Sequence, residues 1–155
     1  MLKKIYLLLL VTFFLNNCGF SPLYTNQSVS NFQIVNLVME GDRTINNFFK
    51  SNLRQFEKIN SDKIFSINID TKYNKKVLSK DKTGKITEYE ISAEVKFQII
   101  SEDKLVKELI LSERKNMKDI SDKFEEQKEE NITKQSFASI MSNKLINELS
   151  ILNDY

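Results

Sequence analysis

The sequence predicts an α+β fold, a two-layer sandwich in which two helices pack on one face of a four-stranded, mostly antiparallel sheet. Two central segments alternate apolar and polar side chains, as half-buried strands do. Two other segments, near residue 45 and after Ser121, repeat their apolar residues every three or four positions, as amphipathic helices do. Each helix has a single apolar stripe and the central strand has a single apolar face, so we expect both helices to cover that face.

The first predicted strand and helix lie between residues 32 and 56. Phe32 to Met39 are mostly apolar and either β-branched or aromatic, which favours a strand that stops at Glu40-Gly41-Asp42. Thr44 is a suitable capping residue for the helix that follows. Residues at helical spacing build one largely apolar face: Ile45, Phe48, Phe49, Asn52 and Phe56.

Three consecutive strands are predicted next, forming an antiparallel meander. Between Ile64 and Leu78, the side chains on one face are Phe65, Ile67, Ile69, Thr71 and Tyr73. In the following strand, one face carries Tyr89, Ile91, Ala93, Val95, Phe97 and Ile99, and the other is polar, as in a sheet with one wet face. Turns at Lys82 to Lys85 and at Ser101 to Lys104 connect these strands to a last one at Leu105 to Arg114.

A long C-terminal helix is predicted after Ser121. Its apolar stripe consists of Phe137, Met141, Leu145, Leu149 and Leu152, widened by Ala138 and Ile140. Its first part carries Glu125, Glu126, Glu129 and Glu130, where the helix dipole favours negative charge.

The N-terminus has the features of a bacterial lipoprotein precursor. Lys3 and Lys4 precede an uncharged apolar run from Ile5 to Leu15, which is too short to span a bilayer and is typical of a signal peptide. Cys18 is the only cysteine, so it has no internal disulfide partner. We expect cleavage after residue 17, a diacylglyceryl and an N-acyl lipid on Cys18, a tether at 18–30 and one domain at 31–155. Asn17 departs from the small residue usual before the cysteine, and cleavage with an unmodified Cys18 is the alternative.

The composition argues against most catalytic and metal-binding classes. There is no histidine and no second cysteine, and no Gly-rich phosphate loop occurs. A site made of carboxylates alone can be drawn, but these residues lie on polar faces beside lysines, which favours a solvated surface. Without Lys3 and Lys4 the chain has equal numbers of acidic and basic residues, so its charge does not indicate nucleic-acid binding. We predict a protein that is not an enzyme and holds no metal.

One segment is locally cationic. This segment, residues 72–85, contains one acidic residue, Asp81, and six lysines: Lys72, Lys75, Lys76, Lys80, Lys82 and Lys85. Lysines on a long hairpin can simply keep it soluble and protect its edges. The functional alternative is contact with the phosphates of an anionic glycolipid, and these six lysines are the candidate lipopolysaccharide-contacting residues.

Residues 18–24 carry a family resemblance. The string Cys18, Gly19, Phe20, Ser21, Pro22, Leu23, Tyr24 resembles the mature start of the LPS-assembly lipoprotein family, LptE, in its alphaproteobacterial form. The predicted element order is also similar to that of the family over nearly the whole mature chain. The resemblance implies an outer-membrane lipoprotein on the periplasmic side, which plugs the LptD β-barrel, assists its assembly and supports lipopolysaccharide transport to the outer leaflet. Gly19 agrees with outer-membrane sorting, because an Asp at that position is what commonly retains lipoproteins at the inner membrane.

Two other kinds of small outer-membrane lipoprotein remain as alternatives. A lipid or lipoprotein carrier resembling LolB would need a deep apolar cavity, and the predicted elements are few for that purpose. The second alternative is a small outer-membrane lipoprotein that binds some other protein and has no barrel partner. A cell-wall hydrolase is disfavoured because histidine and a suitable nucleophile are missing.

Overall fold

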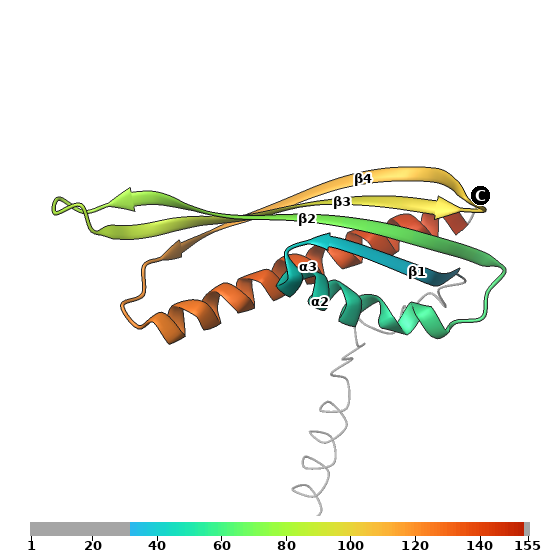
Figure 1. Cartoon of the computed structure of the whole chain (residues 1–155), viewed down its shortest axis with the longest axis horizontal. Helices are drawn as coiled ribbons and strands as arrows, with labels where there is room; N and C mark the ends of the chain where they lie inside the picture. The colour runs from blue at the N-terminus through green and yellow to red at the C-terminus, as the bar shows by residue number, and fades with distance from the viewer. Residues whose placement is uncertain (1–31, 154–155) are drawn as a thin grey trace, which may run out of the picture.

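The computed structural model describes residues 32–153, which form one sheet and two main helices (Figure 1). The elements in chain order are β1 (Phe32–Gly41), α2 (Arg43–Leu53), the 3-10 helix η2 (Arg54–Lys58), β2 (Lys63–Lys80), β3 (Ile86–Ser101), β4 (Lys104–Lys118) and α3 (Lys123–Asn153). The predicted signal peptide and tether, residues 1–30, lie outside the described residues. No helix within 32–153 is long and apolar enough to cross a membrane.

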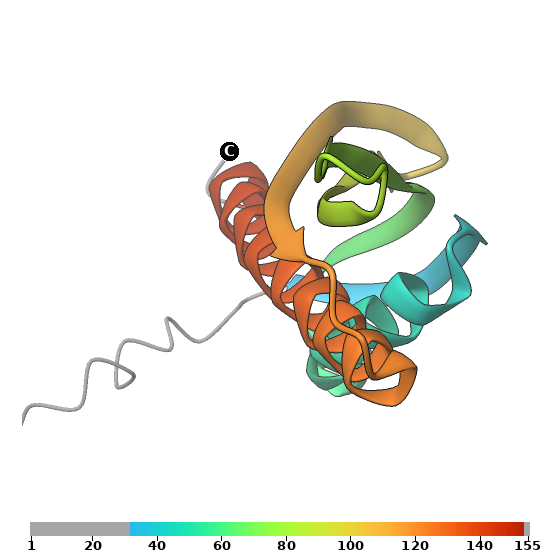
Figure 2. The ribbon, with the colours of Figure 1, turned by 90° about the vertical axis from the view of Figure 1, so that its left-hand side faces the viewer.

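The four strands pair in the order β1-β2-β3-β4. β1 runs parallel to β2, whereas β2–β3 and β3–β4 are antiparallel hairpins. Both helices lie on the same side of the sheet, and α3 runs along most of its length (Figures 1 and 2). The predicted two-layer α+β fold with two helices on one face is therefore confirmed, and the parallel β1–β2 pair makes the sheet mixed.

The core lies between the helices and the odd-numbered side chains of the central strands, as the alternation predicted. Phe49 of α2 meets Phe97 of β3 edge-on, with ring centroids 5.4 Å apart. Phe32 of β1 stacks on Phe56 of η2 at 5.1 Å. The apolar stripe of α3 supplies Phe137, Ala138, Met141, Leu145 and Leu149, all buried. Burial of this apolar surface is the main force that holds the two layers together.

The start of α2 differs from the prediction. Asp42, not Thr44, is the N-cap residue, and its Oδ1 accepts a hydrogen bond from the backbone N–H of Ile45 at 2.9 Å. The preceding residue, Gly41, has a φ of +92°, and a Cβ at this position would lie 1.9 Å from the backbone oxygen of Thr71. The close pairing of β1 with β2 therefore fixes where the chain turns into α2.

Three smaller expectations also needed correction. Ile140 was expected to widen the apolar stripe of α3, but it is 39% exposed because it lies on the side of the helix away from the sheet. Phe56 is buried as expected, but it belongs to η2 and not to α2. β4 continues four residues beyond the predicted end at Arg114, to Lys118, because the long β3 provides partners that far.

Candidate functional site

The hairpin of β2 and β3 extends beyond the first turn of α3 and ends in a tight turn (Figure 1). Asp81 organises that turn, because its Oδ1 accepts hydrogen bonds from the backbone N–H groups of Thr83 and Lys85. Its carboxylate also accepts a hydrogen bond from the Thr83 hydroxyl, and this interaction lowers the pKa of Asp81. The turn therefore holds a fixed shape, with the side chains of Lys82 and Lys85 exposed at its tip.

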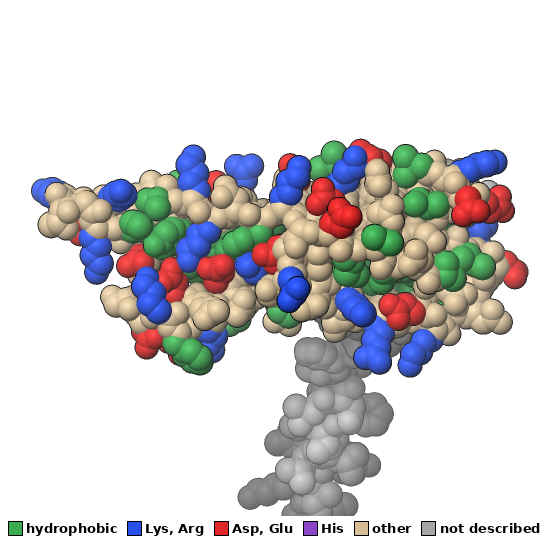
Figure 3. Space-filling view, viewed as in Figure 1, with side chains coloured by type: hydrophobic (Ala, Val, Ile, Leu, Met, Phe, Trp, Pro, Cys, Tyr) green, Lys and Arg blue, Asp and Glu red, His purple; other side chains and the backbone are tan. Residues whose placement is uncertain are grey.

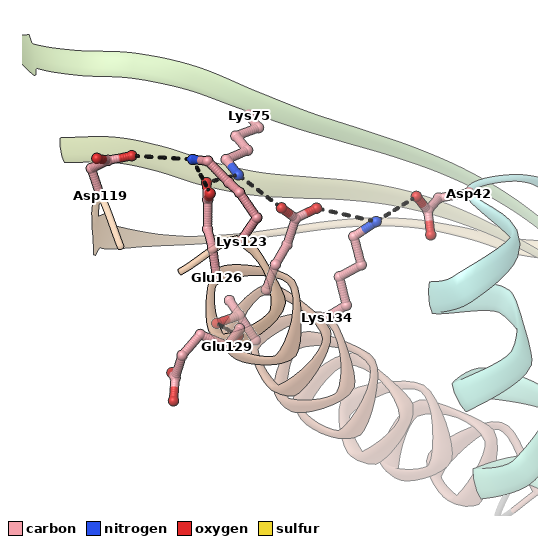
Figure 4. A network of polar contacts seen from close by, with 9 residues as sticks. Asp42, Lys75, Asp119, Lys123, Glu126, Glu129 and Lys134 are labelled. Atoms are coloured by element: carbon pink, nitrogen blue, oxygen red, sulfur yellow. Dashed lines mark hydrogen bonds and ion pairs between the residues drawn. The ribbon is translucent and has the colours of Figure 1, made fainter. Parts of the chain in front are cut away.

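The structure divides the six predicted lysines between two faces. Lys72, Lys76 and Lys80 are exposed, and Lys72 forms a surface ion pair with Glu94 at 3.4 Å. Lys75 instead points toward α3 (Figure 4). Among residues 32–153, no ion pair involves Lys76, Lys80, Lys82 or Lys85, and all four of these lysines are exposed.

Two further cationic side chains, those of Arg114 and Lys118, lie on β4, next to the hairpin of β2 and β3. Arg114 is paired with Ser92, and Lys118 with Glu88, so the end of β4 places both beside the hairpin. Sequence reasoning missed them because about thirty residues separate them from the lysine-rich segment. The signal that could have found them is the alternation of side chains along β4, aligned with that of β3 in an antiparallel pair.

Lys75 belongs to a chain of alternating charges that we call the ionic seam (Figure 4). Its members, in spatial order, are Asp119, Lys123, Glu126, Lys75, Glu130, Lys134 and Asp42. The seam joins the loop before α3, the first three turns of α3, β2 and the N-cap of α2. It therefore adds paired charges to the contact between the hairpin and the first half of α3, beside the partly buried Tyr73 and Tyr89 and the buried Met117.

The central contacts of the seam are short. The Nζ of Lys75 lies 2.7 Å from Glu126 Oε1 and 2.9 Å from Glu130 Oε2. The Nζ of Lys123 lies 2.6 Å from the other oxygen of Glu126. Charge-assisted hydrogen bonds of this length are stronger than neutral ones. The Glu126 side chain, only 8% exposed, is thus held between two ammonium groups.

Lys134 closes the other end of the seam. Its side chain is 10% exposed, and its Nζ lies 3.0 Å from Asp42 Oδ2 and 3.7 Å from Glu130 Oε1. The same ammonium group lies 3.8 Å from the centre of the Tyr73 ring, and that of Lys75 lies 4.5 Å from the centre of the Tyr89 ring. Aromatic faces stabilise cations that have lost part of their hydration.

The pKa shifts follow from these contacts. The hydrogen bonds from Lys123 and then Lys75 lower the pKa of Glu126. Burial opposes ionisation of Glu130, but the ammonium groups of Lys75 and Lys134 outweigh it, so the pKa of Glu130 is also lowered. Burial likewise opposes the charge on Lys75, yet its two carboxylate partners raise its pKa. Every shift favours the charged form, so the seam consists of stable ion pairs.

The geometry of the seam suits a structural role, which is to hold the hairpin against α3. Each of its carboxylates is paired with an ammonium group, and the pKa values of Glu126 and Glu130 are lowered, whereas a general acid at neutral pH needs a raised one. Within residues 32–153 there is no group of three or more side chains that could hold a metal ion. The seam fixes the hairpin on α3 and thereby presents the lysines of its other face and tip to solvent.

Comparisons with known proteins agree with this fold. Rare lipoprotein B from Shewanella oneidensis superposes with a TM-score of 0.58 at 13% identity, covering 76% of this chain and 96% of that one. A minor lipoprotein from Acinetobacter baumannii gives 0.57 at 14% identity, with 80% and 93% covered. A putative lipoprotein from Caulobacter crescentus gives 0.54 at 8% identity, with 81% and 92% covered.

The chain has the fold of these lipoproteins. No protein-family model matches the sequence, and no curated protein sequence matches it. The likeness is therefore one of three-dimensional structure, and at these identities it extends to the fold alone. The predicted lipidation site Cys18 and the signature residues Gly19, Phe20, Pro22, Leu23 and Tyr24 lie outside the described residues.

Proposed function

We propose that this chain is an outer-membrane lipoprotein, tethered through lipids on Cys18, that plugs and helps to assemble an LptD-like β-barrel. In that role it supports lipopolysaccharide transport to the outer leaflet. The carrying observation is the two-helix, four-stranded fold, which the chain shares with three proteins named as lipoproteins over at least 76% of its length. The string from Cys18 to Tyr24, which resembles the start of the LptE family, agrees with it.

The shape of the domain supports a binding role rather than a carrier role. A carrier of the LolB type would use an apolar cavity between sheet and helices to hold a lipid. Here that space is filled by large buried side chains, including Phe32, Phe49 and Phe97, all 0% exposed. Interiors packed in this way leave no room for an acyl chain.

The cationic hairpin is the proposed contact for lipopolysaccharide phosphates. Lys76, Lys80, Lys82 and Lys85 are exposed and take part in no ion pair within residues 32–153, so they are free to meet an anion. Lys75 is engaged with Glu126 and Glu130, so its proposed role is to hold the hairpin rather than to bind the ligand.

Co-purification tests the proposed function. The full-length chain is expressed in a lipopolysaccharide-producing host with its own tag, extracted in mild detergent and purified. We expect a large β-barrel protein to be recovered with it in near-equal amount. The variant C18A tests the tether, and mass spectrometry of the mature N-terminus should find a lipid-modified cysteine in the wild type only. Recovery of the chain without any barrel protein would contradict the proposal.

A second experiment tests the hairpin. Charge reversal of Lys76, Lys80 and Lys82 to Glu should reduce lipopolysaccharide pull-down at least tenfold, because phosphate contacts are lost and repulsion is added. The matched control reverses Lys50, Lys58 and Lys104, which are also exposed but lie away from the hairpin tip. If both triple variants bound lipopolysaccharide equally well, the proposed role of the hairpin would be wrong, whereas the proposed binding to a β-barrel would be unaffected.

A further inference from the structure

The solvent-facing side of α2 and η2 is basic. Between residues 43 and 58 the chain carries four basic side chains, which we call the basic flank: Arg43, Lys50, Arg54 and Lys58. The one acidic side chain in the same stretch is Glu57, and all five are exposed. Arg43, Lys50 and Arg54 are seven and four residues apart, a spacing that places them on one side of the helix. Figure 3 shows Lys and Arg side chains over this part of the molecule.

The charges of the basic flank are not neutralised by neighbouring carboxylates. Within residues 32–153, no ion pair involves a member of the flank, whereas lysines of β2, β3, β4 and α3 all take part in such pairs. The exposed residues between the basic ones are uncharged, namely Asn47, Ser51 and Gln55. The flank therefore presents a net positive surface that attracts anions.

Acidic side chains lie beyond the basic flank at both ends of the domain. Glu125 and Glu129 are exposed on the first turns of α3, and Asp62 is exposed in the loop before β2. Glu102 and Asp103 form the turn between β3 and β4. The positive surface is thus limited to α2 and η2, so an anionic partner is met by this side of the domain and not by the whole of it.

The basic flank lies close to the point where the chain comes from the predicted anchor. Phe32, the first residue of β1, stacks on Phe56 of η2 with ring centroids 5.1 Å apart. Residues 19–31 connect Cys18 to this point and reach at most about 50 Å even when fully extended. β2 has 18 residues, so it leads from the η2 end to the hairpin turn over about 60 Å. An anchor at Cys18 therefore keeps η2 near the membrane, whereas the hairpin tip can lie much farther away.

We propose that the basic flank lies on the anionic phospholipid headgroups of the membrane in which Cys18 is anchored. The inference rests on the lipid anchor of the proposed function and does not depend on the barrel partner. Near an anionic membrane surface, each Lys or Arg strengthens binding about fivefold. Lipid chains and a basic patch together attach a protein far more stably than one acyl chain does.

The contact is electrostatic, because the apolar side of α2 is not available to the bilayer. Ile45, Phe49 and Leu53 are all 0% exposed and belong to the core between helix and sheet. An amphipathic helix that inserts into a membrane turns such residues toward the acyl chains. Here α2 would have to leave the sheet to do so, and the exposed basic side chains are what reaches the phosphates. Salt should therefore weaken the contact by screening.

This contact also orients the domain on the membrane. β1 and α2 then face the headgroups, and β4, at the opposite edge of the sheet from β1, lies farthest from them. The hairpin tip, with Lys82 and Lys85, is separated from η2 by the whole length of β2 and stays accessible. The two basic surfaces of the domain are thus expected to act independently.

The test measures how close the domain lies to a membrane that holds the same lipid anchor in every sample. The full-length lipoprotein carries a fluorescent donor on one introduced cysteine, in S51C beside the basic flank or in S112C on β4 as the control. It is placed in phosphatidylcholine vesicles with or without about one third phosphatidylglycerol, which carry an acceptor on a headgroup. We expect energy transfer from S51C to be at least twofold higher on the anionic vesicles and to lose this increase in about 1 M salt, where screening is nearly complete. Transfer from S112C should not change.

Charge reversal identifies the residues responsible. K50E/R54E/K58E should abolish the increase at S51C while its circular dichroism matches that of the wild type. The matched control K76E/K80E/K82E makes the same change of charge on the hairpin and should keep the increase. Equal transfer from S51C on the two kinds of vesicle, which needs no charge variant to measure, would overturn the inference, and so would an equal loss in both triple variants. A chain that is not lipid-modified and stays on neither vesicle would instead overturn the proposed anchor, and this inference with it.

Discussion

Lys75 of β2 and Glu130 of α3 are 55 residues apart in the sequence, yet Lys75 Nζ lies 2.9 Å from Glu130 Oε2. Both side chains are mostly shielded from solvent, at 25% and 21% exposed. The pair sits at the centre of the ionic seam, where the hairpin meets the first half of α3. Paired charges therefore help to hold this part of the domain together, beside the apolar contacts of Tyr73, Tyr89 and Met117.

Removing the central cation should destabilise the domain. In K75M, Glu126 and Glu130 keep Lys123 and Lys134 but lose their shared partner, so we expect the free energy of unfolding to fall by about 1–2 kcal/mol. Urea titration followed by circular dichroism measures it. K72M is the matched control on the same strand, because the Lys72–Glu94 pair is exposed (72% and 54%) and should contribute at most about 0.5 kcal/mol. Equal effects of the two variants would show that the seam contributes no more than a surface ion pair.

The seam should make stability depend on acid pH. The pKa values of Glu126 and Glu130 are lowered in the folded protein, so their contribution is complete above the ordinary carboxyl value of 4.5. It is lost as the pH falls below that value through the folded pKa values. We expect the difference in unfolding free energy between the wild type and E130Q to be largest near pH 7 and to shrink below pH 4.5. A difference that stays constant from pH 7 to pH 3 would contradict this.

Asp42 has two roles that two substitutions separate. D42N keeps an oxygen to accept the hydrogen bond from the Ile45 N–H but loses the charge that faces Lys134. D42A loses both interactions. An N-cap contributes about 1 kcal/mol, so D42A should unfold about 1 kcal/mol more easily than D42N. Identical midpoints in urea for the two variants would mean that the cap contributes nothing here.

The two glycines with positive φ should respond very differently to alanine. At Gly41 (φ +92°) a Cβ would meet the backbone oxygen of Thr71 at 1.9 Å, and backbone cannot move aside cheaply. G41A should cost on the order of 3 kcal/mol or more, because strain and overpacking add. Gly84 has a similar φ of +85° but open space around it, so G84A should cost only about 1 kcal/mol. Thermal unfolding of the two variants side by side measures the difference.

The sequence by itself determined the element order, the two helices on one sheet face and most of the core. Alternation is a strong signal in β3, because the odd-numbered residues from Ile91 to Ile99 are all buried and the even-numbered ones between them are not. The helical spacing of Phe137, Met141 and Leu145 is equally direct, since one face of α3 is buried. These patterns are local, so they can be read without knowing which segments meet.

Only the tertiary structure decided which charged side chains pair in the ionic seam and which lysines of the hairpin remain exposed. Glu126 and Lys134 looked like ordinary solvated residues, because charge on a helix usually faces water. They are nearly buried because the long hairpin, of which Lys75 is part, lies over the first half of α3. Whether a lysine binds a neighbour or remains free depends on which chain segments fold against it, and periodicity within one segment carries no information about that.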